Sequence, residues 1–232
     1  MIRRPPRSTQ AKTLFPTRRS SDLDIQALTV DLSEKKVPEI KEDECLVRVF
    51  SAGINPSDVL AASGYFKHAV LPRIPGRDFA GTVVKGPDHL IGKKVWGTGG
   101  DAGIGSDGTH AEYLKLHIDQ LSEIPHTMDL VIAGGQTLPY VTAYYALVSR
   151  AAIKPSESVL VVGALGQVGR AAMSILKWKK CFPIALVRGE EQVAQASKLG
   201  WIAVNSEESD LAQKIRISSQ GASLNPSSEK YP

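Results

Sequence analysis

Residues 159–169 read Val159-Leu-Val-Val-Gly163-Ala-Leu-Gly166-Gln-Val-Gly169, and this stretch decides the fold of the second half of the chain. The apolar run is typical of a buried strand, and the glycines turn the chain into a helix. Glycines at these spacings let backbone N–H groups approach a pyrophosphate at the positive end of the helix dipole. Against the pattern G-x-G-x-x-G, the first position is Ala164, and such a pattern alone is often only a turn.

The segments around this loop favour a dinucleotide-binding site over a simple turn. Hydrophobic spacing predicts helices over residues 138–151, 168–180 and 190–199, and strands over residues 159–162, 183–187 and 201–204. Strands and helices that alternate at these lengths begin a doubly wound parallel sheet of the Rossmann type. We therefore expect a dinucleotide to bind Gly163, Ala164, Leu165, Gly166, Gln167, Val168 and Gly169.

The residue at the end of the second strand of such a sheet selects between NAD and NADP. An acidic side chain there binds the ribose 2′-hydroxyl, whereas a cation suits a 2′-phosphate. Here the strand ends in Leu186-Val187-Arg188, and Glu190 and Glu191 follow as residues that the helix dipole favours in a first turn. The sequence therefore predicts a preference for NADPH, with Arg188 as a cofactor-binding residue.

The first half of the chain has a different character. From Asp24 onward, short β-prone segments alternate with Gly and Pro, and strands are expected over residues 45–50, 79–84 and 94–96. Six glycines lie between Gly97 and Gly108, which predicts a mobile surface loop. These features indicate an irregular, barrel-like β domain.

Four motifs occur in a fixed order outside the glycine loop. They are Ala52-Gly-Ile-Asn55-Pro-Ser-Asp58, Ile74-Pro-Gly-Arg77-Asp78-Phe-Ala-Gly81, Gly108-Thr-His-Ala-Glu112-Tyr113 and Thr142-Ala-Tyr-Tyr-Ala-Leu147. With the loop, they resemble the medium-chain dehydrogenase/reductase superfamily, in particular its quinone oxidoreductase and enoyl reductase branch, in which an alanine such as Ala164 commonly begins the glycine motif. The resemblance implies an α/β chain: a GroES-like catalytic domain over residues 24–135, then the N-terminal half of a Rossmann domain over residues 136–217.

The resemblance also implies chemistry without a metal. Zinc-dependent alcohol dehydrogenases carry a cysteine where this chain has Asn55-Pro56-Ser57, and a histidine before the acid where it has Arg77-Asp78. Catalytic zinc needs three protein ligands and structural zinc four, and the histidines here are scattered without ligand spacing. We expect no metal site, and Arg77 and Asp78 are most simply an ion pair. The implied enzyme transfers a hydride from NADPH to a quinone or an α,β-unsaturated carbonyl acceptor.

Three residues receive roles through the same resemblance. Asn55 corresponds to an asparagine near the nicotinamide, and Thr142 to a threonine that faces the same ring. Tyr65 matches a tyrosine that enoyl reductases use as proton donor or orienter, a role that suits a phenol. The alternatives are that Tyr65 only covers the cleft and that Asn55 only caps the turn before Pro56.

The ends of the chain have unusual compositions. Residues 1–23 hold a net charge of +5, so the formal charge of +4 leaves −1 for the remaining 209 residues, and a general nucleic-acid-binding surface is not expected. This leader is expected to be non-native or disordered: its phrases resemble translated sequencing adapter, and a transit peptide is the alternative. Residues 218–232 are polar and of low complexity, which predicts a disordered tail.

The length of 232 residues leaves two functional hypotheses open. The first is an active reductase, and the second is a truncated, catalytically incompetent fragment that at most binds nucleotide. Cys45 and Cys181 do not suggest a disulfide scaffold, so a reducing compartment is expected. The predicted location is the cytoplasm, or the mitochondrion if the leader is a genuine transit peptide. The expected partner is a small electrophilic acceptor, with no membrane contact and a homodimer possible for a full-length family member.

Overall fold

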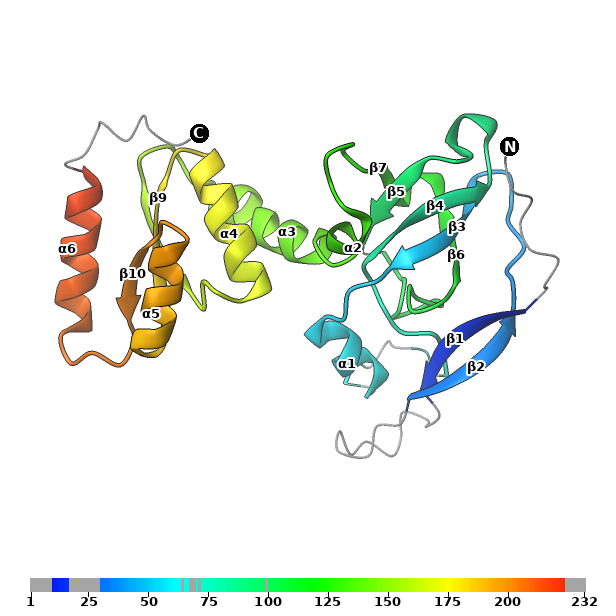
Figure 1. Cartoon of the computed structure of the whole chain (residues 1–232), viewed down its shortest axis with the longest axis horizontal. Coiled ribbons are helices and arrows are strands. Elements are labelled where there is room, and N and C mark those ends of the chain that lie inside the picture. Colours follow the sequence, from blue (N-terminus) through cyan, green and yellow to red (C-terminus); the bar gives the residue numbers. More distant parts are fainter. Residues whose placement is uncertain are drawn as a thin grey trace. The chain divides into compact units, whose positions relative to one another are not determined.

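The computed structural model describes residues 10–16, 30–63, 65–66, 70, 72–98 and 100–223. It divides into two compact units, Met1–Leu138 and Pro139–Pro232, which are described separately (Figure 1). Among the described residues, no helix is long and apolar enough to cross a membrane.

The first unit is built on an antiparallel five-stranded sheet with the order β6-β3-β4-β5-β7. Its strands are β3 (Glu44–Ser51), β4 (Phe79–Lys85), β5 (Lys94–Gly97), β6 (Tyr113–His117) and β7 (Ser122–Glu123). The three strands predicted from sequence are confirmed. Apolar side chains from four of these strands, among them Val47, Phe79, Val95 and Leu114, form the core, because alternate residues of each strand point to one face.

Short elements surround this sheet. They are α1 (Pro56–Ala62), the 3-10 helices η2 (Asp88–Leu90) and η3 (Ile118–Gln120), and α2 (Leu130–Ala133). Helix α1 was not expected from sequence. It begins after Asn55, with Pro56 at its first position, where the fixed φ of proline and its missing N–H are both tolerated.

Part of the leader, which was expected to be non-native or disordered, forms a strand in the structure. Strand β1 (Gln10–Pro16) pairs antiparallel with β2 (Val30–Lys36), from Gln10 opposite Lys36 to Pro16 opposite Val30. The other residues of the leader, 1–9 and 17–23, lie outside the described part of the chain.

The glycine-rich stretch before residue 108, expected to be a mobile surface loop, is partly buried. Ala102, Gly103 and Gly108 are buried. A Cβ on Gly103 or on Gly108 would come within 2.5 Å or 2.3 Å of the Gly76 carbonyl oxygen, so both positions require glycine. The buried Arg73 side chain donates from Nε to the Gly103 carbonyl at 2.8 Å and from Nη1 to Val70 at 2.6 Å.

The second unit contains the predicted parallel sheet. Its elements are β8 (Ser158–Val162), α4 (Gln167–Trp178), β9 (Phe182–Val187), α5 (Gly189–Lys198), β10 (Ile202–Asn205) and α6 (Leu211–Ser223). The strands pair in parallel in the order β10-β9-β8, which confirms the beginning of a doubly wound sheet. Figure 1 shows α4 and α6 on opposite sides of this sheet. Met173 and Leu176 of α4 are buried in its core.

Two helices differ from the sequence-based expectation. The segment expected as one helix over residues 138–151 is an α-helix, α3 (Thr137–Tyr144), followed by a π-helix, η4 (Tyr145–Arg150). Helix α6 continues to Ser223, so the expected disordered tail does not begin at Ser218. Residues 224–232 lie outside the described part.

Candidate functional site

The glycine loop of the second unit joins β8 to α4. Gly163 has a φ of +68°, which favours glycine, and its N–H donates to the Leu186 carbonyl of β9 at 3.0 Å. The Gly166 N–H closes the turn on the Gly163 carbonyl at 3.0 Å. Gly166 is the N-cap of α4 and offers no side-chain cap, so N–H groups of the first helical turn stay available to an anion.

Glycine and alanine in this loop are set by close backbone contacts. A Cβ on Gly169 would lie 2.3 Å from the Gly163 carbonyl oxygen and 2.7 Å from the Cα of Ala164. Ala164 is completely buried, and its methyl group belongs to the core of the unit. Above Gly163, by contrast, a Cβ would meet nothing within 4 Å. The loop is therefore tight toward the helix and open on the side of Gly163, as a pyrophosphate site requires.

Arg188 lies at the end of β9, as predicted, and is the N-cap of α5. Its side chain is 80% exposed, and its Nε is 3.9 Å from Glu207 Oε1, so this ion pair is long and exposed. Glu190 and Glu191 occupy the first turn of α5, as expected.

Asn205 organises the same region and was missed by the sequence analysis. Its buried Oδ1 accepts hydrogen bonds from the N–H groups of Gly189 at 2.9 Å and of Glu207 at 3.1 Å. Its Nδ2 donates to Glu190 at 2.9 Å. These bonds hold the loops that flank Arg188 while leaving its guanidinium exposed. Sequence gave little indication of them, because Asn205 is 16 residues from Gly189.

In the first unit, Asn55 lies between two buried carboxyl groups. Its Nδ2 is 3.3 Å from Asp58 Oδ2 and 3.2 Å from Asp78 Oδ2, and its backbone N–H donates to Asp58 Oδ2 at 2.7 Å. The other oxygen of Asp78 accepts the Leu138 N–H at 2.8 Å, in the first turn of α3. Asp78 is completely buried and Asp58 is 3% exposed. The sequence pattern alone does not indicate a site role for either carboxyl group.

Burial dominates the protonation of both groups. It raises the pKa of the Asp58 carboxyl, although the Asn55 N–H and the charges of His110 and Arg77 act in the opposite direction. Burial also raises the pKa of Asp78, against the nearby Thr98 hydroxyl and the hydrogen bonds from Asn55 and Leu138, and the Asp58 charge raises it further. Asp58 Oδ1 is buried and has no hydrogen-bond partner in the described part of the chain.

The expected ion pair between Arg77 and Asp78 is not formed. The hydrogen bonds to Asp78 come instead from Asn55 and Leu138, and Arg77 Nε is buried with no hydrogen-bond partner in the described part. His110 Nε2 lies 3.0 Å from the Gly53 carbonyl oxygen, within hydrogen-bond distance.

The other predicted site residues lie in more open surroundings. Tyr65 is 67% exposed, and its ring packs edge-on against Phe66 with the centroids 5.8 Å apart. The described contacts do not join its hydroxyl group to Asn55. Thr142 is exposed on α3. The roles expected for Tyr65, Asn55 and Thr142 remain predictions.

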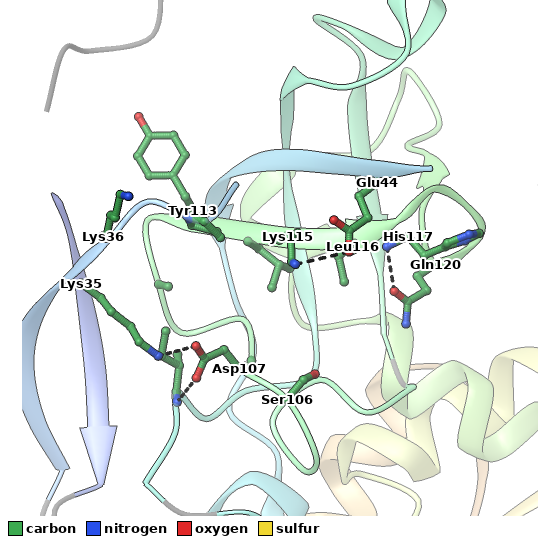
Figure 2. A pocket seen from close by; sticks show the side chains of 15 residues that line it. Lys35, Lys36, Glu44, Ser106, Asp107, Tyr113, Lys115, Leu116, His117 and Gln120 are labelled. Carbon is green, nitrogen blue, oxygen red and sulfur yellow. Dashed lines mark hydrogen bonds and ion pairs between the residues drawn. The ribbon is translucent and has the colours of Figure 1, made fainter. Parts of the chain in front are cut away.

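Two cavities lie apart from these predicted residues. The first, of about 550 Å³, is lined by residues of β2 and β6 and by Asp107, and Figure 2 shows its ion pairs Lys35–Asp107 and Lys115–Glu44. The second, of about 540 Å³, is apolar and lies between α3, η4 and α4, with Tyr144 and Trp178 in its wall. None of the predicted site residues lines either cavity.

Comparison with known proteins identifies relatives of the chain. Residues 41–126 match the family model of the alcohol dehydrogenase GroES-like domain. A zinc-type alcohol dehydrogenase-like protein of Schizosaccharomyces pombe is 42% identical over 162 residues, 69% of this chain and 50% of that protein. The human quinone oxidoreductase is 35% identical over 149 residues, 62% of this chain and 44% of that protein. The chain thus spans about half the length of these curated relatives.

A solved structure agrees with this result. An alcohol dehydrogenase superfamily protein from Novosphingobium aromaticivorans is 28% identical, with a TM-score of 0.75 over 86% of this chain and 59% of that chain. The predicted resemblance and fold class are confirmed.

We predict that Gly169→Ala weakens dinucleotide binding and destabilises the second unit. The new Cβ would displace the backbone of Gly163 and Ala164, at a cost of about 1–3 kcal/mol. Urea unfolding and NADPH titration measure the two effects. Gly135→Ala is the matched control, because its Cβ would meet only Gly53 Cα at 3.9 Å. Unchanged stability and binding in Gly169→Ala would contradict the packing described above.

The buried carboxyl groups predict a fall in stability as pH rises. Because the pKa of Asp58 is raised on folding, the folded state binds more protons than the unfolded state, and its stabilising contribution is lost as pH rises from about 4 through the folded pKa. Asp58→Asn mimics the protonated acid and should flatten this dependence, whereas Asp88→Asn, at an exposed position, should not. Urea unfolding between pH 4 and 8 tests this. A wild-type curve with the same slope as that of Asp58→Asn would exclude it.

Proposed function

The chain contains the alcohol dehydrogenase GroES-like domain and is a homologue of quinone oxidoreductases, and on this basis we propose that it is an NADPH-dependent reductase acting without zinc. The acceptor class is a quinone or an α,β-unsaturated carbonyl compound. The observation that carries the proposal is the β8–α4 loop, which is tight at Gly169, open at Gly163 and uncapped at the start of α4. The partner is then a small molecule, and the proposed location is the cytoplasm, or the mitochondrion if the leader is a transit peptide.

The residues present fit a dinucleotide phosphate. The N–H groups at the start of α4 would hold the pyrophosphate. Arg188 would pair with the 2′-phosphate, since its guanidinium is exposed and its ion pair with Glu207 is long. NADPH supplies the hydride when bound, while the protein orients it and excludes water. Tyr65 is the proposed proton donor for the reduced acceptor.

The side chains at the positions where zinc-dependent alcohol dehydrogenases carry their zinc ligands do not fit a catalytic zinc ion. Asn55 stands at the cysteine position and uses its amide N–H groups on two carboxyl groups, and both oxygens of Asp78 accept hydrogen bonds. Arg77 contributes a cation where zinc would need a neutral histidine. In the described part of the chain, no group of three His, Cys, Asp or Glu residues is arranged to hold a metal ion.

An acceptor panel tests the proposed reaction. The purified chain is mixed with NADPH and one acceptor, which is a simple quinone, an enone or an enoyl thioester. In a separate sample it is mixed with NADP and a primary alcohol. The absorbance of NADPH is followed in each sample. We expect that a quinone or an enone oxidises NADPH, and that this activity persists after treatment with a strong chelator. A cooperative melt and NADPH binding without turnover would favour the alternative of a catalytically incompetent nucleotide-binding chain. Activity lost to the chelator and restored by zinc would refute the zinc-free reaction.

The assignment of Arg188 predicts a change in cofactor preference. Arg188→Asp should weaken NADPH binding relative to NADH by at least about tenfold, because a carboxylate repels the 2′-phosphate and binds a 2′-hydroxyl group. Separate titrations with the two dinucleotides measure the ratio. Arg216→Asp, which changes an exposed side chain of α6, controls for net charge. The same preference in Arg188→Asp as in the unaltered chain would remove Arg188 from the site.

A further inference from the structure

The apolar cavity between α3, η4 and α4 lies wholly within the second unit. It holds about 540 Å³, which is within the range of small-molecule sites. Its wall consists of three tyrosines, two serines, Val141, Ile175 and Trp178. Trp178 is 64% exposed and Tyr145 is 59% exposed, so these rings are not part of the core. Exposed apolar side chains that gather around a hollow mark a surface to which another molecule binds.

The wall of this cavity favours an elongated apolar group. Along α3 and η4 the lining residues run from Tyr140 to Ser149, a length of about 13 Å at the helical rise per residue. The hydroxyl group of Ser174 on the opposite wall already donates to the Arg170 carbonyl at 3.0 Å. Tyrosine and tryptophan rings present apolar faces to a ligand. An alkyl chain matches a wall of this length and composition better than one compact ring does.

The sequence around the cavity is rich in cations and poor in acids. From Leu130 to Arg188 the single acidic residue is Glu157, whose Oε2 accepts the Lys154 N–H at 2.9 Å. The same stretch has seven basic residues, which are Arg150, Lys154, Arg170, Lys177, Lys179, Lys180 and Arg188. Helices α3, η4 and α4 themselves contain no acid.

Two of these cations directly follow residues of the cavity wall. Arg150 ends η4 next to Ser149, and its side chain is exposed. Lys179 follows Trp178, and its Nζ is 4.4 Å from the centroid of the Trp178 ring. Positive charge therefore borders the apolar cavity on both of its helical walls.

We propose that this cavity binds a single-chain anionic amphiphile, of which a medium-chain fatty carboxylate is the simplest example. The alkyl chain would lie against the rings of Tyr145 and Trp178, and the carboxylate would pair with Arg150 or Lys179. The cavity meets α4 at residues 174–178, whereas the glycine loop joins the other end of this helix at Gly166. The site is thus distinct from the proposed dinucleotide site, and the proposal does not rest on the proposed function.

The same charges argue against a second copy of the chain as the occupant. In a two-fold symmetric contact, this face of one copy would meet the identical face of the other. Arg150 and Lys179 would then approach their own counterparts, and α3, η4 and α4 offer no acid to pair with them. Like charges that meet across an interface oppose association. A small anion brings the missing negative charge together with the apolar chain.

Fluorine NMR of the full chain labelled with 5-fluorotryptophan tests the site without NADPH and without an activity assay. The three tryptophans give three signals, and Trp178→Phe identifies the signal of residue 178. Decanoate below its micelle concentration should shift this signal and leave that of Trp96 unchanged. Decanoate should also bind at least about tenfold more tightly than hexanoate, because four more CH2 groups leave water. An unshifted Trp178 signal, or equal binding of the two carboxylates, would overturn the proposal.

Decanol tests the role of charge with an alkyl chain of the same length. The unaltered chain should bind decanoate more tightly than decanol. Arg150→Glu combined with Lys179→Glu should weaken decanoate binding by about two- to fivefold for each exposed charge and leave decanol binding unchanged. Lys198→Glu combined with Arg216→Glu makes the same change of net charge at exposed positions on α5 and α6, and should affect neither compound. Equal weakening by the two double variants would show that only net charge matters and would refute the site.

A substitution in the wall tests the apolar contact. Tyr145→Ser removes one ring and should weaken decanoate binding at least about threefold. Ile217→Ser is the matched control, because Ile217 on α6 has the same exposed fraction of 59% and does not line the cavity. Since both side chains are mostly exposed, both variants should fold. Unchanged binding in Tyr145→Ser would remove the cavity from the proposal.

Other occupants of this surface give different results. Phosphatidylglycerol vesicles or a single-stranded oligothymidylate could shift the Trp178 signal where decanoate does not, and that result would replace the proposal with a membrane or nucleic-acid surface. Sedimentation velocity detects a second copy. A chain that stays monomeric while decanoate shifts the Trp178 signal supports the proposal. A Trp178 shift that depends on protein concentration alone and accompanies dimer formation would overturn it.

Discussion

A completely buried carboxyl group, Asp78, is the constraint on which the first unit depends. Burying such a group is costly unless hydrogen-bond donors reach it. Its donors come from two distant segments: the amide of Asn55 before α1 and the N–H of Leu138 at the start of α3. Asp78 itself precedes β4, whose side chains form part of the core. Satisfying one carboxyl group therefore connects the central sheet to the starts of two helices.

In the second unit, the main constraint is a close approach of backbone atoms instead of a buried carboxyl group. The helix that follows β8 comes so close to the strand that Gly169 has no room for a Cβ, and Ala164 seals the core below the loop. Because the start of α4 is packed so closely against the end of β8, its N–H groups form a fixed set of hydrogen-bond donors. Asn205 fixes the backbone next to Arg188, because its amide forms hydrogen bonds with three polar groups while the Arg188 guanidinium stays exposed.

The β8–α4 loop and the hydrogen bonds of Asp78 differ in how much of each can be predicted from sequence. The β8–α4 loop is local, because the apolar run, the glycines and the start of the helix follow one another within about a dozen residues. The strand, the turn and the helix could therefore be predicted, and the end of the next apolar run gave the place of Arg188. The hydrogen bonds of Asp78 join it to Asn55, 23 positions away, and to Leu138, 60 positions away, and no periodicity in the sequence indicates such pairs. The packing of Gly103 and Gly108 is equally hard to predict. Both permit close backbone packing against Gly76, and Arg73 anchors Gly103, and neither contact is local.

The identity of residue 55 follows from the groups around it. Two buried carboxyl oxygens face residue 55 and need hydrogen-bond donors. Serine has one donor, whereas an asparagine amide has two on its nitrogen. Glutamine has the same amide on a longer side chain, and aspartate would add a third acid to two whose pKa values are already raised by burial. Asparagine supplies both donors within the reach set by the first turn of α1, so the residue that begins this short helix also satisfies the carboxyl group that precedes β4.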